Sequence, residues 1–317
     1  MVGYPTREEL ERRHAWERDD QVPGRPEMTA FRRRLRYHQA GWREAHGHPI
    51  GTQPIAPRAG EHSREVGSRL PLDYARKTGA NFITAGAFKA AKERLTLLEP
   101  NQSIDHQRIW ADMLWSPAIA FNLFGDLAGN PTAADRAMHV WWPKAPGKVL
   151  EIAFSHSPGW LDPRFLNSLR VFDAMISLGR RDGPQGVIAL DIKYHERAKA
   201  ETPRPENLWR YREVAEQSGA FRCGAFDKLK PKTELAVMWL EHLLLLSMLQ
   251  HPSRRWNWGM YVVVHARHNS DFSRLSRQYA NLLSDPSTFA TVTLEELLDG
   301  KALARRTARS LRERYIP

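Results

Sequence analysis

Residues 187–194 have the sequence VIALDIKY, an apolar run that is interrupted only by Asp191, Lys193 and the terminal tyrosine. The upstream run 171–176 reads VFDAMI and carries one acid, Asp173. Runs of this length and composition predict buried strands. A charge inside a buried strand is costly unless it is paired or ligates a metal. These two runs are therefore the strongest indication of both the fold and a site.

The periodicity of a strand places these charges on one face. Side chains alternate between the two faces, so we expect Asp191, Lys193 and His195 to point the same way. If the two runs pair through a turn at residues 179–185, Asp173 lies beside that face. Gly183 and Pro184 within this connection are residues typical of a hairpin turn. Two carboxylates and a lysine would then converge on one point.

The order of the predicted elements indicates an α/β fold with a central sheet flanked by helices. Strands and helices do not alternate as in a regular βαβ repeat, so we expect a mixed sheet rather than an all-parallel one. Helices come first, then three strands, and then helices and strands in turn. The predicted strands are 149–154, 169–178, 186–194, 260–265 and 289–292, and the predicted helices are 85–98, 103–127 with a break near Ser116-Pro117, 233–249 and 272–283.

The first part of the chain differs from the rest, and we divide the sequence into an arm at 1–70 and a domain at 71–317. Thr6 is a candidate N-cap, and residues 49–71 hold several prolines and glycines that predict extended, loop-like chain. A basic cluster interleaved with aromatic residues suits contact with nucleic-acid phosphates and bases. Its cations are Arg32, Arg33, Arg34 and Arg36. The alternative is a basic amphipathic helix that packs through Phe31, Leu35 and Trp42.

Composition limits the partner and the compartment. The 317 residues hold 47 basic and 36 acidic side chains, a net charge of +11, which favours a polyanionic partner such as nucleic acid over a merely basic surface. The single cysteine, Cys223, excludes an intramolecular disulfide and a cysteine zinc site. The apolar run 235–249 contains Glu241 and is shorter than the about 20 residues of a membrane span. We expect a cytoplasmic protein with no membrane contact.

Two carboxylates beside a lysine are suited to a divalent cation. Mg²⁺, or Mn²⁺, prefers oxygen ligands and is bound by one or two carboxylates together with water and substrate phosphate. Such a metal can polarise a phosphoryl oxygen and produce hydroxide from water. The alternative is a buried ion-pair triad with a structural role only. Other histidines, at 46, 48, 265 and 268, lack a third ligand at a suitable spacing.

These residues resemble the PD-(D/E)XK nuclease superfamily, with its restriction-endonuclease-like core. The signature is Asp173 followed by Asp191-Ile192-Lys193. The resemblance extends over roughly residues 30 to 300. Within the superfamily, the chain is similar to a bacterial group of restriction endonucleases of unknown specificity. The further blocks that carry it are 36–44 (RYHQAGWRE), 81–84 (NFIT), 121–125 (FNLFG) and 193–196 (KYHE).

The resemblance implies roles for individual residues. Asp173, Asp191 and the main-chain carbonyl of Ile192 would ligate the metal, and Lys193 would orient water and stabilise the transition state. Phe172 stands where the name-giving proline would be, and Ser155 stands where an acid is expected. Glu151 lies four residues earlier on the same strand and is too far away to replace the acid that is missing at Ser155. Asp112 is a candidate outer-shell acid.

The predicted function is a Mg²⁺-dependent nuclease that hydrolyses DNA phosphodiester bonds, in bacterial defence or DNA processing. The alternatives are a catalytically inactive nuclease fold that binds nucleic acid, an RNA-directed nuclease, and a structural subunit of a larger complex. A homodimer is one open assembly state. The segment at Trp209-Arg210-Tyr211-Arg212 could contact nucleic acid or be an ordinary packed turn.

Overall fold

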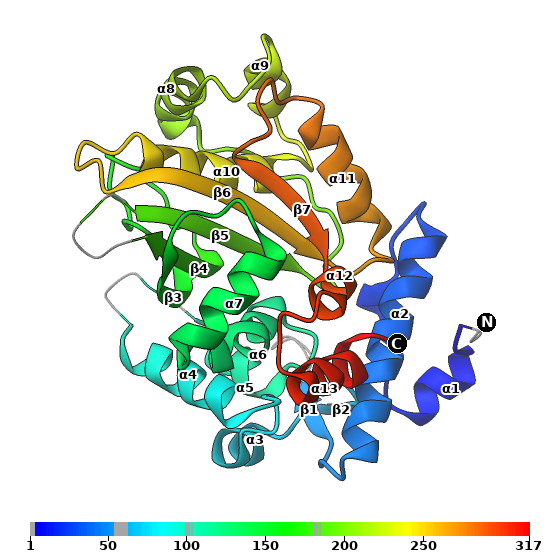
Figure 1. Ribbon diagram of the computed structural model, residues 1–317. Helices are drawn as coiled ribbons and strands as arrows, with labels where there is room; N and C mark the ends of the chain where they lie inside the picture. The colour runs from blue at the N-terminus through cyan, green and yellow to red at the C-terminus, as the bar shows by residue number, and fades with distance from the viewer. Residues whose placement is uncertain (1–3, 54–62, 99–101, 103, 180–182, 184) are drawn as a thin grey trace.

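Five strands form one mixed sheet in the computed structural model, which describes the whole chain except residues 1–3, 54–62, 99–101, 103, 180–182 and 184 (Figure 1). The strand order is β3-β4-β5-β6-β7. The first three strands pair antiparallel, and the β5–β6 and β6–β7 pairs are parallel. The strands are β3 (Lys148–His156), β4 (Phe172–Gly179), β5 (Gln185–Lys193), β6 (Trp256–His265) and β7 (Phe289–Thr293).

The predicted α/β class and the mixed, helix-flanked sheet are therefore confirmed, and every predicted strand is present. The β4–β5 register pairs Ala174 with Leu190. One further step along the same register places Asp173 opposite Asp191. Most of the turn that was predicted between these strands lies outside the described residues.

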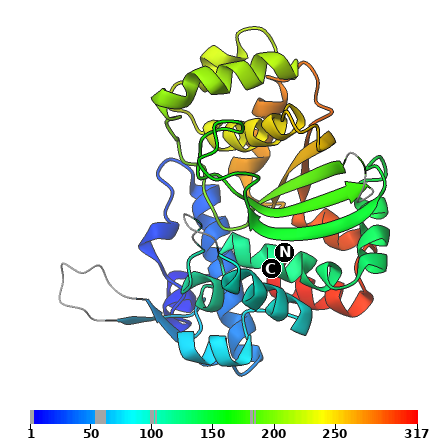
Figure 2. The same cartoon turned by 90° about the vertical axis from the view of Figure 1, so that its left-hand side faces the viewer.

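Helices cover both faces of the sheet, as the two views in Figure 1 and Figure 2 show. One apolar cluster joins the sheet to α8, α10 and α11, and a larger one joins its other face to α4, α6, α7 and the C-terminal helices. The helices are α1 (Arg7–Arg12), α2 (Pro26–Ala45), α3 (Leu72–Thr78), α4 (Ala85–Thr96), α5 (Arg108–Ala111), α6 (Ser116–Ala128), α7 (Pro131–Trp141), α8 (Leu208–Ser218), α9 (Ala225–Leu229), α10 (Ala236–Leu249), α11 (Ser270–Ala280), α12 (Leu294–Asp299) and α13 (Arg305–Tyr315), with single 3₁₀ turns at η1 (Arg18–Asp20) and η2 (Pro205–Asn207).

Two helices on opposite faces follow directly from local sequence. Helix α6 begins at Ser116-Pro117, because proline in the first turn lacks only an N–H that the helix does not use. This explains the predicted break, which separates α5 from α6. Helix α10 is apolar on all sides and is almost entirely buried against β6 and α8. Among the described residues no helix combines the length and the apolar character that crossing a membrane requires.

The N-terminal arm is folded against the rest of the chain. Thr6 caps α1 with a capping box, as predicted. Helix α2 contacts α11 and α13, and its Phe31 and Leu35 are buried in the larger apolar cluster (Figure 1). The packed-helix alternative for this segment is therefore confirmed. A boundary near residue 70 stays a prediction.

Two parts of the chain differ from expectation. The proline-rich segment 49–71 was predicted to be loop-like, but β1 (Gly51–Gln53) and β2 (Arg64–Val66) pair as a small antiparallel ribbon. Gly51 permits this because a Cβ there would lie 2.3 Å from the backbone of Leu70. Six short helices in the described part of the chain were not predicted, namely α3, α7, α8, α9, α12 and α13. They gain their stability from packing on the two apolar clusters rather than from an apolar run of their own.

Candidate active site and the cavity beside it

Asp173 and Asp191 lie side by side on adjacent antiparallel strands. They are 8% and 6% exposed. One oxygen of Asp173, Oδ2, accepts a hydrogen bond of 2.8 Å from the main-chain N–H of Ile192. This bond ties the acid of β4 to the middle of the Asp191-Ile192-Lys193 segment. The pairing of the two strands thus brings together the acids that the sequence pattern predicted to meet.

Lys193 and Tyr261 hold the carboxylate of Asp191. The Lys193 ammonium donates to Oδ1 at 2.8 Å, and the Tyr261 hydroxyl donates to Oδ2 at 3.2 Å. The Lys193 ammonium also lies 5.9 Å from the centre of the Phe272 ring. Each carboxylate oxygen has two lone pairs, so both oxygens of Asp191 retain capacity for a further partner.

The electrostatics of this group show an excess of negative charge. Burial raises the pKa of Asp173 well above its usual value, and the neighbouring charge of Asp191 raises it further. Burial by itself would lower the pKa of Lys193, but the charges of Asp191 and Asp173 outweigh it and hold that pKa above its usual value. The single lysine is charged and does not neutralise both acids.

The residues present fit a divalent cation. Two adjacent carboxylates offer oxygen ligands, and a bound dication would remove the repulsion that raises the pKa of Asp173. Within the described part of the chain, no group of three or more His, Cys, Asp or Glu side chains is arranged to hold a metal. An ion at this site would therefore complete its shell with a main-chain oxygen, such as that of Ile192, together with water or substrate oxygen.

Two further acids near this group were not predicted as site residues. Burial raises the pKa of Glu241 on α10 to about 7, even though Arg170 opposes the shift, and the charge of Asp191 adds to it. Glu196 follows β5 and accepts hydrogen bonds from the Ser116 hydroxyl at 2.6 Å and from the His195 N–H at 3.1 Å. A charge inside an otherwise apolar helix was the available sequence signal for Glu241. For Glu196 the available signal was its place in the block 193–196 that carries the family resemblance.

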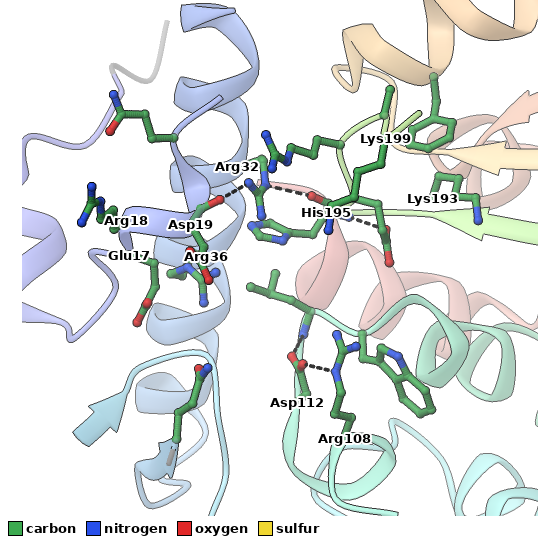
Figure 3. A pocket seen from close by; sticks show the side chains of 18 of the residues that line it. Glu17, Arg18, Asp19, Arg32, Arg36, Arg108, Asp112, Lys193, His195 and Lys199 are labelled. Carbon is green, nitrogen blue, oxygen red and sulfur yellow. Dashed lines mark hydrogen bonds and ion pairs between the residues drawn. The ribbon is translucent and has the colours of Figure 1, made fainter. Parts of the chain in front are cut away.

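Lys193 opens onto a cavity of about 1080 Å³ (Figure 3). One wall comes from the arm, around Arg18 and Asp19, and the opposite wall comes from the chain that follows β5, around His195 and Lys199. The floor includes Arg108, Asp112 and Trp115. Basic side chains predominate among the charged residues that line the cavity.

Arg32 and Arg36 belong to a buried cluster in the wall of this cavity. Arg36 donates twice to the Asp20 carboxylate, at 2.6 and 2.9 Å. Arg32 and His195 contact the same carboxylate at 3.5 and 3.1 Å. The expectation that His195 shares a face with Lys193 is wrong, because β5 ends at Lys193 and the imidazole turns to Asp20.

The other two arginines of the predicted basic cluster do not line the cavity. Arg34 donates to the carbonyl of Pro317 at 2.8 Å, and Arg33 is half-buried on the same helix. Arg32 and Arg36 thus line the cavity, but both are paired with the buried Asp20 carboxylate. Arg33 and Arg34 lie elsewhere on α2 and do not line the cavity.

The auxiliary acids weighed from the sequence have defined places. Ser155 is buried in β3 with a φ of 43°, and its carbonyl accepts from Arg94 at 2.9 Å. Glu151 is exposed on the same strand. Asp112 accepts from Arg108 at 2.9 Å and from the N–H of Leu114 at 3.0 Å, so its carboxylate is engaged within the cavity floor.

The remaining candidates have ordinary packing roles. His46 stacks on Trp42 with ring centres 4.0 Å apart, and the Nδ1 of His265 lies 2.9 Å from the carbonyl of Ala266. The segment around Trp209 is the first turn of helix α8. Its Tyr211 packs edge-on against Trp239, whereas Trp209 is exposed.

Comparison with known proteins places the chain in a family. No curated protein and no solved structure matches it. The family described as the PD-(D/E)XK nuclease superfamily matches residues 26–317. This range begins at the first residue of α2 and includes β4 and β5, whereas the cavity wall around Arg18 and Asp19 lies before it. This match covers nearly the whole chain, and the mixed sheet flanked by helices is consistent with the fold of this family. The chain therefore belongs to the PD-(D/E)XK nuclease superfamily.

Proposed function

We propose that this nuclease hydrolyses phosphodiester bonds of DNA with a divalent cation, Mg²⁺ or Mn²⁺, at Asp173, Asp191 and Lys193. The observation that carries the proposal is the pair of adjacent buried carboxylates that shares a single lysine at the wall of a basic cavity. A structural triad would be expected to balance its charges, whereas this group has one negative charge too many.

The residues of the site divide into two roles. Asp173, Asp191 and the carbonyl of Ile192 would hold the cation. When bound, the cation would supply charge stabilisation to the phosphoryl group and lower the pKa of a water molecule. Lys193 is the cation of the chain itself that reaches both Asp191 and the cavity. In this proposal its ammonium would orient water and stabilise charge that develops on a phosphate.

The inactive-binder alternative predicts a different outcome at the same residues. It is supported by Ser155, which supplies no carboxylate at the position where an acid was expected. In an inactive protein Asp173, Asp191 and Lys193 would bind nucleic acid or stabilise the sheet, and no metal would produce cleavage. The proposed setting, defence or DNA processing in bacteria, depends on the resemblance alone.

A cleavage assay separates these functions. Wild-type protein is incubated with plasmid, linear duplex, single-stranded DNA and RNA, each with Mg²⁺, Mn²⁺ or EDTA. We expect cleavage of DNA with metal and none with EDTA. Asp191→Asn should reduce the rate by roughly 10²–10³-fold, as the loss of one electrostatic group does in other enzymes.

The matched control is Asp227→Asn, the same chemical change at an exposed residue of α9 that pairs with Lys230 at the surface. It should cleave as the wild type does. Cleavage in EDTA, or full activity of Asp191→Asn, would contradict the site assignment. Cleavage of RNA alone would replace DNA as the substrate, and no cleavage of any substrate would favour the inactive binder.

A further inference from the structure

Of the candidate site residues, Lys193 lines the cavity, whereas Asp173 and Asp191 are buried behind it and are not among the residues that line it. Asp173 and Asp191 are less than a tenth exposed, and the Lys193 side chain is 17% exposed. A duplex carries its phosphates on the outside of a wide rod whose major groove alone measures about 12 Å across. One unpaired strand is much narrower. The cavity, at about 1080 Å³, is near the size of a pocket for a small ligand, which is roughly 300–1,000 Å³.

Three cations at the rim are free to meet phosphates. Within the described residues, the side chains of Arg18, Arg197 and Lys199 form no ion pair and no hydrogen bond, and Arg18 and Lys199 are exposed. Figure 3 shows Arg18 and Lys199 on opposite walls. The other arginines of the lining are already paired: Arg32 and Arg36 with Asp20, and Arg69 and Arg108 with Asp112.

An aromatic side chain also lines the cavity. Trp115 lines the floor and is half-buried, and the Arg108 guanidinium lies 5.4 Å from its ring centre. Stacking of a base on an aromatic side chain is typical of single-strand binding and is worth roughly 1–3 kcal/mol per base. A paired base offers no such face, because its neighbours in the duplex cover it.

We infer that the cavity receives a single-stranded stretch of nucleic acid, a free end or an unpaired segment, rather than intact duplex. Arg18 contacts the backbone from the arm wall, and Arg197 and Lys199 contact it from the wall beyond β5. Trp115 stacks on an unpaired base. The strand then passes the Lys193 ammonium. This inference rests on the proposed function and concerns which form of the substrate the site accepts.

The experiment measures binding without cleavage. The Asp191→Asn protein, in EDTA, is titrated into fluorescein-labelled single-stranded DNA, single-stranded RNA of the same sequence, and blunt duplex DNA, with fluorescence anisotropy as the readout. We expect at least one single strand to bind tenfold or more tightly than the duplex. The comparison of the DNA and RNA strands shows which sugar is preferred.

Variants in this background test the individual contacts. Arg197→Ala combined with Lys199→Ala should weaken single-strand binding and reduce the slope of log affinity against log salt by roughly 1.4, about 0.7 for each lost phosphate contact. Trp115→Leu should weaken it by roughly 5- to 100-fold, which is the stacking energy expressed as affinity. The control is Arg306→Ala with Arg309→Ala, the same change of charge at exposed positions of α13 that do not line the cavity.

Several outcomes would overturn the inference. Equal or tighter binding of the duplex contradicts it, and so does an equal loss of affinity in the cavity pair and the α13 pair. If the Trp115→Leu protein melts early, its affinity does not report on stacking, and the double variant at Arg197 and Lys199 then provides the test. Rapid cleavage of blunt duplex by wild type would refute this inference but leave the nuclease function standing. Preferential binding of single strands without cleavage of any substrate would support this inference but contradict the nuclease function.

Discussion

Two clusters of buried charge border the same cavity, and their charge balance is opposite. In the first, the Asp20 carboxylate is fully buried and is contacted by Arg36, Arg32 and His195. In the second, Asp173 and Asp191 share Lys193. Burial tends to raise the pKa of both Asp20 and Asp173. Hydrogen bonds from Arg36 and His195 reverse this at Asp20 and hold its pKa well below the usual range, whereas the charge of Asp191 adds to it at Asp173.

The difference indicates what each cluster is for. A carboxylate that is saturated with donors has no capacity left for a ligand, and its role is to join the arm to the end of β5. Two buried acids that share one lysine repel each other, and this repulsion raises the pKa of Asp173. A bound dication would reduce the repulsion. The following predictions test this contrast, in order of decreasing expected effect.

Removing the charge of Asp20 should have the largest effect on stability. Asp20→Asn leaves the buried Arg36 guanidinium without its anion, and breaking a buried pair from one side typically costs about 3–5 kcal/mol. Urea denaturation measures the change in the free energy of unfolding. The neighbouring Asp19→Asn alters an exposed side chain of the same turn and should unfold as the wild type does. Equal unfolding free energies for the two variants would show that the Asp20 cluster does not stabilise the fold.

Removing the charge of Asp191 should affect activity rather than stability. The roughly 10²–10³-fold loss of cleavage expected for Asp191→Asn corresponds to about 2.7–4 kcal/mol of transition-state stabilisation. Its free energy of unfolding should stay within about 1 kcal/mol of wild type, because relief of repulsion at Asp173 compensates for the lost ion pair with Lys193. A loss of stability like that of Asp20→Asn would identify the pair as a structural cluster too.

A third buried group, His242, is neutral and shows what burial does without any charged partner. Burial lowers its pKa to about 3, and its ring nitrogens lie 2.9 Å from the hydroxyls of Tyr279 and Thr288. The unfolded chain binds a proton near pH 6.5 and the folded chain does not, so stability is full above pH 6.5 and falls as the pH decreases.

This loss amounts to about 2 kcal/mol between pH 7.5 and pH 5. His242→Gln removes the titrating group, so its unfolding free energy should depend less steeply on pH than that of wild type. His156, whose pKa burial lowers to about 4, titrates in the same direction in both proteins and cancels from the comparison. Identical pH profiles for wild type and variant would show that the pKa of His242 is the same in the folded protein as in the unfolded chain.

Glu241 should give the smallest effect at neutral pH. Its pKa of about 7 means that the folded protein already holds it half protonated, so Glu241→Gln should change the unfolding free energy by less than about 1 kcal/mol at pH 7. Because the folded pKa lies above that of the unfolded chain, the wild type loses stability as the pH rises from about 4.5 to 7, whereas glutamine does not titrate. The variant should therefore gain stability relative to wild type between pH 5 and pH 8.5, and a relative loss over that interval would place Glu241 among the ionised, paired acids.

Local sequence was sufficient for the sheet and for the acids of the site. Strand alternation and apolar composition predicted β4 and β5, and a charge within a buried strand stands out for a reason that holds in any fold. The same reasoning marked Asp173, Asp191 and Lys193 before their pairing was known. The resemblance to the PD-(D/E)XK nucleases, now established as family membership, depended on this short signature together with the blocks at 36–44, 81–84, 121–125 and 193–196.

Tertiary structure alone decided what the arginines and the arm do. Arg32 and Arg36 have the composition of a phosphate-binding cluster, and only folding reveals that Asp20 and the end of β5 occupy them. The cavity likewise combines the arm, the floor near Asp112 and the chain after Lys193, three segments far apart in sequence. Periodicity reports which face of an element is buried, but the partner of a buried charge is set by long-range packing, which no local pattern encodes.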